Sequence, residues 1–227
     1  MHSAVGPETE AELLYFSPSK RILTSPQPKV VWDVGMGTGA NVIAAIKKLE
    51  ARHLNQIEFV SFENDLDGLK TALKEQLPVT RGYESALSTL LNHGFFEHPE
   101  LGYKWRLLDQ DFLSILESEK KLPHAHLVYF DFYSPKSCPA LWSVEVFVSL
   151  KKYCHSEALF ITYSSSTKVR YALLKAGFFV GKGATTTMKA ETTHAALTLS
   201  TLESPLDSQW LSRKDFANEF EGNTQFL

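Results

Sequence analysis

Three glycines at two-residue spacing directly follow an apolar run whose second-to-last residue is an acid. The run 30–34 is apolar and mostly β-branched except for Asp33, and Gly35, Gly37 and Gly39 come next. Glycine permits positive φ and lets a ligand lie against bare backbone N–H groups at a helix start. Apolar residues at helical spacing continue from residue 40 to residue 50. We therefore expect a strand, a tight turn and a helix that bind a nucleotide-like cofactor through Asp33, Gly35, Gly37, Thr38, Gly39 and Asn41.

Three acidic residues indicate which cofactor this turn binds. The G-x-G-x-x-A spacing that begins at Gly35 also fits a dinucleotide fingerprint. However, Asp33 precedes the first glycine by two residues, where it can meet the cationic amino-acid part of S-adenosylmethionine, which NAD lacks. Glu63 ends the second predicted strand and can accept ribose hydroxyls. Asp111 follows the third strand and can accept the adenine amine, or it only caps the next helix. The pattern favours S-adenosylmethionine over a dinucleotide.

Strand-like and helix-like segments alternate along the chain, which is typical of a mainly parallel sheet covered on both faces. The predicted strands are 30–34, 57–62, 105–108, 127–132, 158–163, 178–182 and 195–201. No helix separates the last two, so we expect them to pair antiparallel. The connection 78–102 is expected to hold a short helix at 86–92. Phe95 and Phe96 are expected to form local core, or alternatively a lid or a base-stacking surface. The prediction is an α/β, Rossmann-like fold of the class I methyltransferase type, with a seven-stranded, mainly parallel sheet and an antiparallel C-terminal hairpin.

Length and composition limit the function classes. The chain has 227 residues, 44% of them hydrophobic and 22% charged, with a formal net charge of −3. These values are ordinary for a soluble globular protein and exclude a strongly basic nucleic-acid binder. We expect a methyltransferase domain at 1–202, with a lead-in segment at 1–29, and a polar C-terminal tail at 203–227. No apolar run has the length of a membrane helix. The two cysteines show no metal-ligand spacing. We therefore expect a cytoplasmic protein that has no membrane partner and binds no metal.

An acid at the tip of the fourth predicted strand is the candidate catalytic residue. Asp131 is followed by Phe132, Tyr133, Ser134 and Pro135, a combination that predicts a rigid turn over the pocket. A carboxylate at such a tip can hold an amine and aim its lone pair at an activated methyl group. The reaction is an in-line displacement, which requires alignment and a neutral amine. We therefore expect methyl transfer to nitrogen.

Several motifs resemble the methyltransferase module of the bacterial tRNA 5-methylaminomethyl-2-thiouridine biosynthesis enzymes, in its stand-alone form without the flavin-dependent oxidoreductase module. They span about residues 1–200, and the most specific is the segment 131–142, which general methyltransferases lack. The other motifs are the turn 35–41, Glu63, and the segments 162–164, 169–170, 176–178 and 189–191.

The resemblance implies that the chain methylates the aminomethyl group of a modified wobble uridine in tRNA. Asp131 matches the catalytic aspartate of the family, and Gly35, Gly37, Glu63 and Asp111 match cofactor-binding positions. The acceptor side would comprise Phe132, Tyr133, Pro135, Trp142, Tyr163, Lys189 and Glu191. The partners implied are tRNA as substrate and a separate flavin-dependent or other enzyme that supplies the precursor.

Four positions depart from the family pattern. Met36 replaces a phenylalanine, Cys138 replaces an asparagine, and Ala190 stands where the late motif has an arginine. Phe132 replaces the glycine beside Asp131, which adds bulk where the acceptor is expected to enter. Two other interpretations therefore stay open. One is a methyltransferase of the same fold that acts on another amine, RNA or protein, and the other is a non-catalytic cofactor-binding interaction protein.

Overall fold

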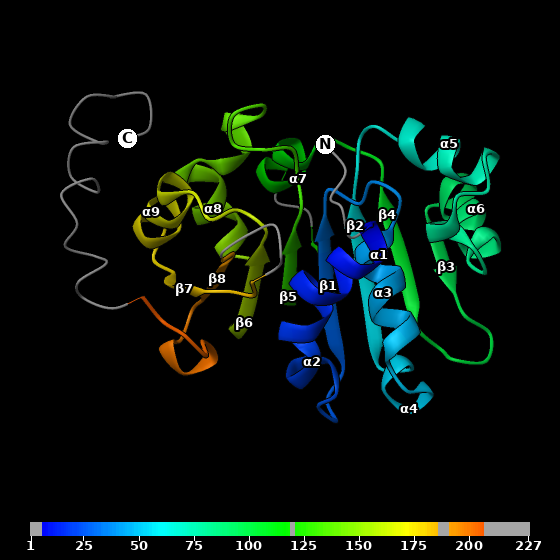
Figure 1. Ribbon diagram of the computed structural model, residues 1–227, viewed down its shortest axis with the longest axis horizontal. Helices are drawn as coiled ribbons and strands as arrows, with labels where there is room; N and C mark the ends of the chain where they lie inside the picture. Colours follow the sequence, from blue (N-terminus) through cyan, green and yellow to red (C-terminus); the bar gives the residue numbers. More distant parts are fainter. Residues whose placement is uncertain (1–5, 119–120, 186–190, 207–227) are drawn as a thin grey trace.

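The computed structural model describes residues 6–118, 121–185 and 191–206 and shows one mixed sheet with helices on both faces (Figure 1). The sheet has eight strands in the order β3-β4-β2-β1-β5-β6-β8-β7. Their bounds are β1 Lys29–Val34, β2 Ile57–Phe62, β3 Phe95–Glu97, β4 Lys104–Leu108, β5 Ala125–Phe130, β6 Cys154–Thr162, β7 Phe179–Lys182 and β8 Thr193–Ala196. The predicted α/β fold is confirmed.

The five central strands run parallel. β1 pairs with β2 on one side and with β5 on the other, and β4 and β6 extend the sheet outward. The inner strands β1, β2 and β5 are rich in apolar, β-branched and aromatic residues, which suits strands that are buried on both faces. All five carboxyl ends therefore meet at one edge of the sheet, which is where open α/β sheets bind ligands.

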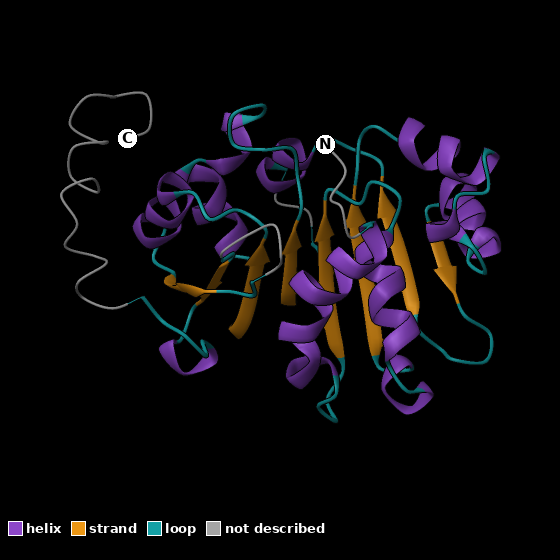
Figure 2. Ribbon diagram, in the orientation of Figure 1, coloured by secondary structure: helices purple, strands orange, loops and turns teal. Residues whose placement is uncertain are grey.

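Helices cover the two faces of this sheet separately (Figure 2). The bounds on the first face are α1 Pro7–Ala11, η1 Glu12–Phe16, α2 Ser17–Leu23, α3 Ala40–Lys48, α4 Ala51–Leu54, α5 Asp67–Lys74, η2 Pro78–Thr80 and α6 Glu84–His93. On the other face lie α7 Phe112–Glu117, η3 Pro139–Trp142, α8 Val144–Lys151 and α9 Thr167–Lys175. Alternate residues of each strand point to opposite faces, so the protein has two apolar cores with the sheet between them.

The predicted C-terminal hairpin is confirmed, with a shifted final strand. β8 pairs antiparallel with both β6 and β7. It ends at Ala196, and the rest of the predicted strand 195–201 contains a short 3₁₀ turn, η4 (Leu199–Thr201). The C-terminal edge therefore has the expected topology but shorter strands.

The prediction of seven strands missed one short strand. Phe95–Glu97 forms β3, which pairs antiparallel with β4 at the other edge of the sheet. Gly94 ends α6 with a positive φ of 69° and so turns the chain directly into this strand. Phe95 is exposed and lies beneath the guanidinium of Arg106, while Phe96 packs on the core. Phe95 and Phe96 are therefore part of the sheet edge. In the strand order, three strands separate β3 from β5.

The lead-in segment folds onto the first face as one continuous helical stretch. α1, the π-helical turn η1 and α2 follow each other without a break, and η1 packs against α3 and β6. Leu14, Tyr15 and Phe16 are buried by this packing. π-helical turns are frequently found at functional sites.

In the described ranges, no helix combines the length and apolar character required to cross a membrane. Those ranges also contain no group of three or more His, Cys, Asp or Glu residues placed to hold a metal ion. Of the predicted polar tail 203–227, only residues 203–206 are described, and residues 207–227 lie outside the described part.

Candidate active site

The glycine turn joins β1 to α3 and packs directly against the end of β5. Gly35 has a φ of 87°, and a Cβ built there would lie 2.8 Å from the carbonyl oxygen of Asp131. The backbone N–H of Asp131 in turn donates a 2.8 Å hydrogen bond to the carbonyl of Val34. Glycine at position 35 is therefore what allows the turn and the predicted catalytic residue to lie side by side.

Gly37 and Gly39 serve different purposes in the same turn. A Cβ on Gly39 would lie 3.1 Å from the ring of Trp105, so this glycine permits close packing of α3 on the sheet. A Cβ on Gly37 would meet no atom within 4 Å, because the exposed side of the turn faces open space. Thr38 lies between them and is half-buried. The turn thus presents a bare backbone to whatever binds above it.

Asp33 is a fully buried carboxyl group directly below this turn. The hydroxyl of Ser61 donates a 2.8 Å hydrogen bond to its Oδ2 atom, and the indole of Trp105 donates to that hydroxyl. The Oδ1 atom has no hydrogen-bond partner among the described residues. Burial, with the negative charges of Asp131 and Glu63, raises the pKa of Asp33 from 3.8 to about 7. A cationic ligand above the turn would meet an acid that lacks a compensating charge.

Glu63 follows β2 and reaches across to the glycine turn. Its Oε2 accepts a 3.0 Å hydrogen bond from the backbone N–H of Gly37. Its Oε1 accepts hydrogen bonds from the backbone N–H groups of Asn64 and Asp65. The structure therefore shows Glu63 holding two loops together. Oε1 already accepts two hydrogen bonds, whereas Oε2 accepts one and retains acceptor capacity toward a hydroxyl group of a ligand.

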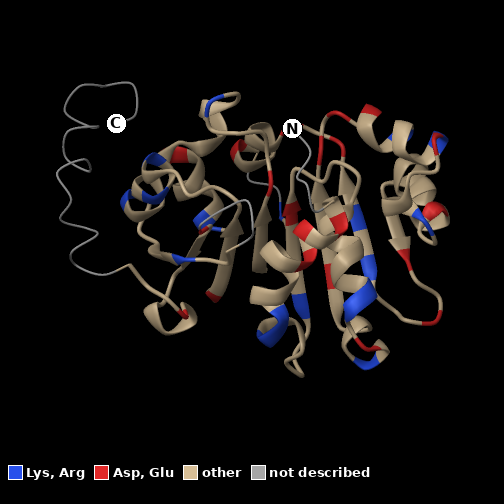
Figure 3. Cartoon of the chain, in the orientation of Figure 1, with Lys and Arg blue, Asp and Glu red and all other residues tan. Residues whose placement is uncertain are grey.

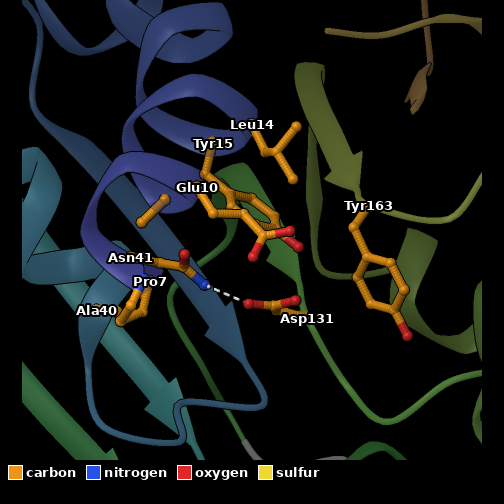
Figure 4. Close-up of a pocket in the computed structure, with 9 residues that line it drawn as sticks. Pro7, Glu10, Leu14, Tyr15, Ala40, Asn41, Asp131 and Tyr163 are labelled. Carbon is orange, nitrogen blue, oxygen red and sulfur yellow. Dashed lines mark hydrogen bonds between the residues drawn. The ribbon is translucent and has the colours of Figure 1, made fainter. Parts of the chain in front are cut away.

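Asp131 comes directly after β5 and lines a cavity of about 220 Å³. The side-chain amide of Asn41, in the first turn of α3, donates a 3.0 Å hydrogen bond to its Oδ2 atom (Figure 4). Asn41 is itself buried, so it holds the carboxylate in one orientation. The cavity is lined by Pro7, Glu10, Ala11, Leu14, Tyr15, Ala40, Asn41, Asp131 and Tyr163.

Two tyrosines flank this carboxylate. Tyr15 is buried, and burial together with the charge of Asp131 raises its pKa well above the usual value. For Tyr163, burial and the same charge raise the pKa to about 12. The Tyr163 hydroxyl donates a 2.9 Å hydrogen bond to the carbonyl of Phe132, so its ring forms a wall of the cavity. Both phenols therefore stay protonated next to an acid.

Phe132 does not occupy the expected entrance of the acceptor. Its ring packs against Phe130 and Phe112, in the core on the far face of the sheet. Phe132 follows Asp131 by one residue, and successive side chains at a strand end point to opposite faces. The expectation that this substitution adds bulk beside the acceptor is thus wrong.

The segment after Asp131 is fixed by buried contacts. The buried indole of Trp142 packs on Phe130 and Tyr163, and its N–H donates a 3.0 Å hydrogen bond to the carbonyl of Tyr133. The Tyr133 side chain is 70% exposed, whereas Pro135 is half-buried. Of the predicted acceptor residues, Trp142 therefore supports the loop and Tyr133 projects from it.

Three other predicted site residues have different local roles or lie outside the described structure. Asp111 caps α7, where its Oδ2 accepts hydrogen bonds from the backbone N–H and the hydroxyl of Ser114. Glu191 forms a 2.7 Å ion pair with the buried Arg170 on α9. Lys189 lies outside the described residues. None of the three lines the cavity at Asp131 as far as the chain is described.

Sequence reasoning missed the contribution of the lead-in segment. Glu10, Leu14 and Tyr15 line the cavity, although they lie more than 100 residues before Asp131. The signal available in the sequence is the apolar run 13–16, which must be buried against another element. The run does not reveal which element that is.

The site fits S-adenosylmethionine because it offers carboxylate oxygens as hydrogen-bond acceptors beside an open turn. Asp33 provides a buried, unpartnered carboxyl oxygen that suits the ammonium group of its amino-acid part. Oε2 of Glu63 would accept from a ribose hydroxyl, and the open space over Gly37 would receive the ligand against bare backbone. When bound, the cofactor supplies an electrophilic methyl group on a sulfonium centre.

Comparisons with known proteins relate the chain to methyltransferases. A family model described as an S-adenosyl-L-methionine-dependent methyltransferase matches residues 96–198. The tRNA 5-methylaminomethyl-2-thiouridine biosynthesis bifunctional protein MnmC of Burkholderia vietnamiensis is 32% identical over 162 residues, which cover 64% of this chain and 24% of that protein. MnmC of Campylobacter fetus is 28% identical over 159 residues, which cover 67% of this chain and 26% of that protein.

A solved structure shows the same fold. The crystal structure of MnmC2 from Aquifex aeolicus matches 95% of this chain and 68% of its own, with a TM-score of 0.72 and 23% identity. The chain spans about a quarter of the length of the two curated MnmC relatives. The range matched by the family model contains both Asp131 and Tyr163 of the cavity. From this relationship and its fold, the chain is an S-adenosylmethionine-dependent methyltransferase related to the methyltransferase part of the MnmC proteins.

Proposed function

We propose that the chain transfers a methyl group from S-adenosylmethionine to the nitrogen of an aminomethyl group on a modified wobble uridine in tRNA. The observation that carries this proposal is the placement of Asp131. Its carboxylate lines a cavity beside the cofactor turn and is held there by Asn41. A fixed carboxylate next to a methyl donor is what an amine acceptor requires, since it both binds the ammonium form and can take its proton.

The proposed role of Asp131 is to make the amine nucleophilic. An alkyl ammonium ion is protonated at neutral pH and has no lone pair to offer. Asp131 accepts a hydrogen bond from the ammonium group and receives one proton, which leaves the neutral amine facing the donor. The new N–CH₃ bond then forms as the S–CH₃ bond breaks, and the product is a secondary ammonium ion.

The tRNA substrate is supported by the relatives. MnmC of Burkholderia vietnamiensis and of Campylobacter fetus are both named as tRNA 5-methylaminomethyl-2-thiouridine biosynthesis proteins. Such a biosynthesis ends in a methylated aminomethyl group, which matches the chemistry available at Asp131. The exposed ring of Tyr133 projects from the loop that follows Asp131 and offers a surface for stacking on a base.

A free small amine is a second candidate acceptor, favoured by the charges around the site. Among the described residues that line the cavity there is no lysine or arginine. Figure 3 shows acidic residues on loops near the carboxyl ends of the central strands. Lys20 and Arg21 lie in the last turn of α2, and Lys47 and Lys48 lie in the last turn of α3. Phosphate groups bind through positive charge, so a small cation would meet less repulsion here than a polyanion.

One experiment separates these acceptors. The protein is incubated with methyl-labelled S-adenosylmethionine and either bulk tRNA that lacks the final methyl group or a panel of small primary amines. The labelled tRNA is digested to nucleosides to find the methylated one. Label in a 5-methylaminomethyl uridine, with none in the small amines, supports the proposal. Label only in small amines selects the second candidate.

A further inference from the structure

The two residues that directly follow Asp131 have their backbone carbonyls held by aromatic side chains. The Tyr163 hydroxyl donates a 2.9 Å hydrogen bond to the carbonyl of Phe132. The indole N–H of Trp142 donates a 3.0 Å hydrogen bond to the carbonyl of Tyr133. Asp131, Phe132 and Tyr133 lie outside the helices and strands of the described chain. These two side chains therefore fix a segment that has no ladder or helix to hold it.

The two donor side chains form one packed unit. The rings of Tyr163 and Trp142 meet edge to face, with their centroids 6.0 Å apart. Trp142 is 4% exposed and also packs against Phe130, the last residue of β5, with ring centroids 5.0 Å apart. Tyr163 directly follows β6, which pairs with β5 in the sheet. Because this packing holds both rings, their donor atoms are fixed relative to the end of β5.

Asp131 is consequently held from two sides. Asn41 donates to its carboxylate, and Tyr163 holds the chain one residue further on (Figure 4). The backbone N–H of Asp131 also donates a 2.8 Å hydrogen bond to the carbonyl of Val34. A shift of the segment that follows Asp131 would change the backbone position from which its carboxylate reaches into the cavity. The hydrogen bond from Tyr163 opposes such a shift.

We propose that Tyr163 is a positioning residue for methyl transfer, because its hydroxyl holds the Phe132 carbonyl and so keeps the Asp131 carboxylate aligned with the methyl donor. A misplacement of about 1 Å can lower the rate of an aligned reaction about a hundredfold. The Tyr163 hydroxyl already donates its proton to the protein backbone. Its removal therefore acts on the position of the carboxylate. This inference rests on the proposed function, because it takes Asp131 as the group that prepares the amine.

Single-turnover methyl transfer by Tyr163→Phe tests this role. The substitution removes the hydroxyl and keeps the ring that lines the cavity. The protein is saturated with methyl-labelled S-adenosylmethionine and mixed with increasing amounts of bulk tRNA that lacks the final methyl group. We expect the rate at saturating tRNA to fall about ten- to hundredfold. The half-saturating tRNA concentration and the affinity for S-adenosylmethionine should both stay within about twofold of wild type, since neither depends on the alignment of Asp131.

Tyr153→Phe is the matched control. Tyr153 directly precedes β6, whereas Tyr163 directly follows it, and both side chains are half-buried. The same hydroxyl is thus removed at the two ends of one strand, and only one end carries the proposed site. Tyr153→Phe should transfer the methyl group within about twofold of the wild-type rate. Thermal unfolding shows that both variants are folded at the assay temperature.

A double-mutant cycle shows whether Tyr163 acts through Asp131. Once Asp131→Asn has removed the carboxylate, its alignment no longer affects the rate. Adding Tyr163→Phe to Asp131→Asn should therefore change the rate by less than about threefold. The inference is overturned if the two effects multiply, if Tyr163→Phe changes only the half-saturating tRNA concentration, or if it retains the wild-type rate. If small amines accept the methyl group and tRNA does not, the proposed acceptor fails, whereas effects that do not multiply on those amines still support the inference.

Discussion

Asn41, in the first turn of α3, donates a 3.0 Å hydrogen bond from its side-chain amide to Asp131 at the end of β5. The two residues are 90 positions apart, and both lie at the carboxyl edge of the sheet. The bond ties the helix that follows the cofactor turn to the carboxylate of the proposed acceptor site. Donor and acceptor sites are thus connected through one rigid contact, which suits a reaction that depends on alignment.

The first prediction concerns Asp131 itself. Asp131→Asn keeps the shape of the side chain and an oxygen that accepts from Asn41, so the fold should be retained. It removes the charge that binds the ammonium group and the base that takes its proton. We expect methyl transfer to fall by roughly 10²–10⁴-fold, with affinity for S-adenosylmethionine within a few-fold of wild type. Single-turnover assays and calorimetry measure the two quantities, and loss of both together would mean that Asp131 is a structural residue.

The second prediction assigns different roles to Gly37 and Gly35, which lie in the same turn. Gly37→Val places a side chain in the open space over the turn, so it should abolish cofactor binding, and its positive φ of 53° adds a folding cost of about 1–2 kcal/mol. Gly35→Ala instead collides with the backbone of Asp131 and should lower stability by about 2–3 kcal/mol. Thermal unfolding and calorimetry on both variants give the comparison. Retained binding in Gly37→Val would place the ligand elsewhere.

The third prediction is a pH dependence of stability. The pKa of Asp33 is raised from 3.8 in its ordinary state to about 7 in the folded protein, so the folded state holds this proton more tightly. The stability from Asp33 is therefore fully present below about pH 4 and is lost as pH rises through about 7. The full linkage is at most about 4 kcal/mol. Asp33→Asn should flatten the fall in melting temperature between pH 4 and pH 7, and an unchanged slope would show that another group causes it.

The fourth prediction concerns the protonation of Asp33 when S-adenosylmethionine binds. A cationic ligand over the turn favours the ionised form of Asp33, so binding of S-adenosylmethionine near pH 6 should release protons, up to about one per complex. Calorimetry in two buffers with different ionisation enthalpies counts those protons. Asp33→Asn should bind more weakly and release none. Equal proton release by wild type and Asp33→Asn would contradict the assigned role.

The fifth prediction tests two roles for Glu191. The resemblance to the family implied a role on the acceptor side, whereas the structure pairs Glu191 with Arg170, which is 1% exposed. Glu191→Gln should lower stability by about 1–3 kcal/mol, because the buried guanidinium loses its counter-charge. The KM for the acceptor should stay within twofold. Lys182→Gln is the control, because Lys182 lies 3.9 Å from Glu191 and is about half exposed, so its loss should change stability little.

The parts of the site that could be predicted from sequence are those that depend on local rules. The glycine turn is recognisable because only glycine tolerates its positive φ values and its close approach to Asp131. Asp33 lies near the end of β1 and Asp131 directly follows β5, and the apolar pattern of these two strands indicates that both acids lie at a carboxyl end. Strand alternation also fixes the direction of Phe132, and applying that rule to position 132 would have placed its ring in the core.

The rest of the site depends on contacts between distant segments. Glu10 and Tyr15 reach Asp131 only because the lead-in helix packs on α3 and the sheet, and no local pattern specifies that docking. The partner of Glu191 likewise becomes visible only when β8 places this segment beside α9. The three-residue strand β3 is too short to show the alternation by which strands are recognised.

A crystal structure with S-adenosylhomocysteine and 5-(aminomethyl)uridine tests the central claim most directly. The account predicts the cofactor product over the Gly35–Gly39 turn, its ammonium group near Asp33, and the nucleoside amine within hydrogen-bond distance of Asp131. A complex in which the turn stays empty, or in which the amine lies away from Asp131, would contradict it.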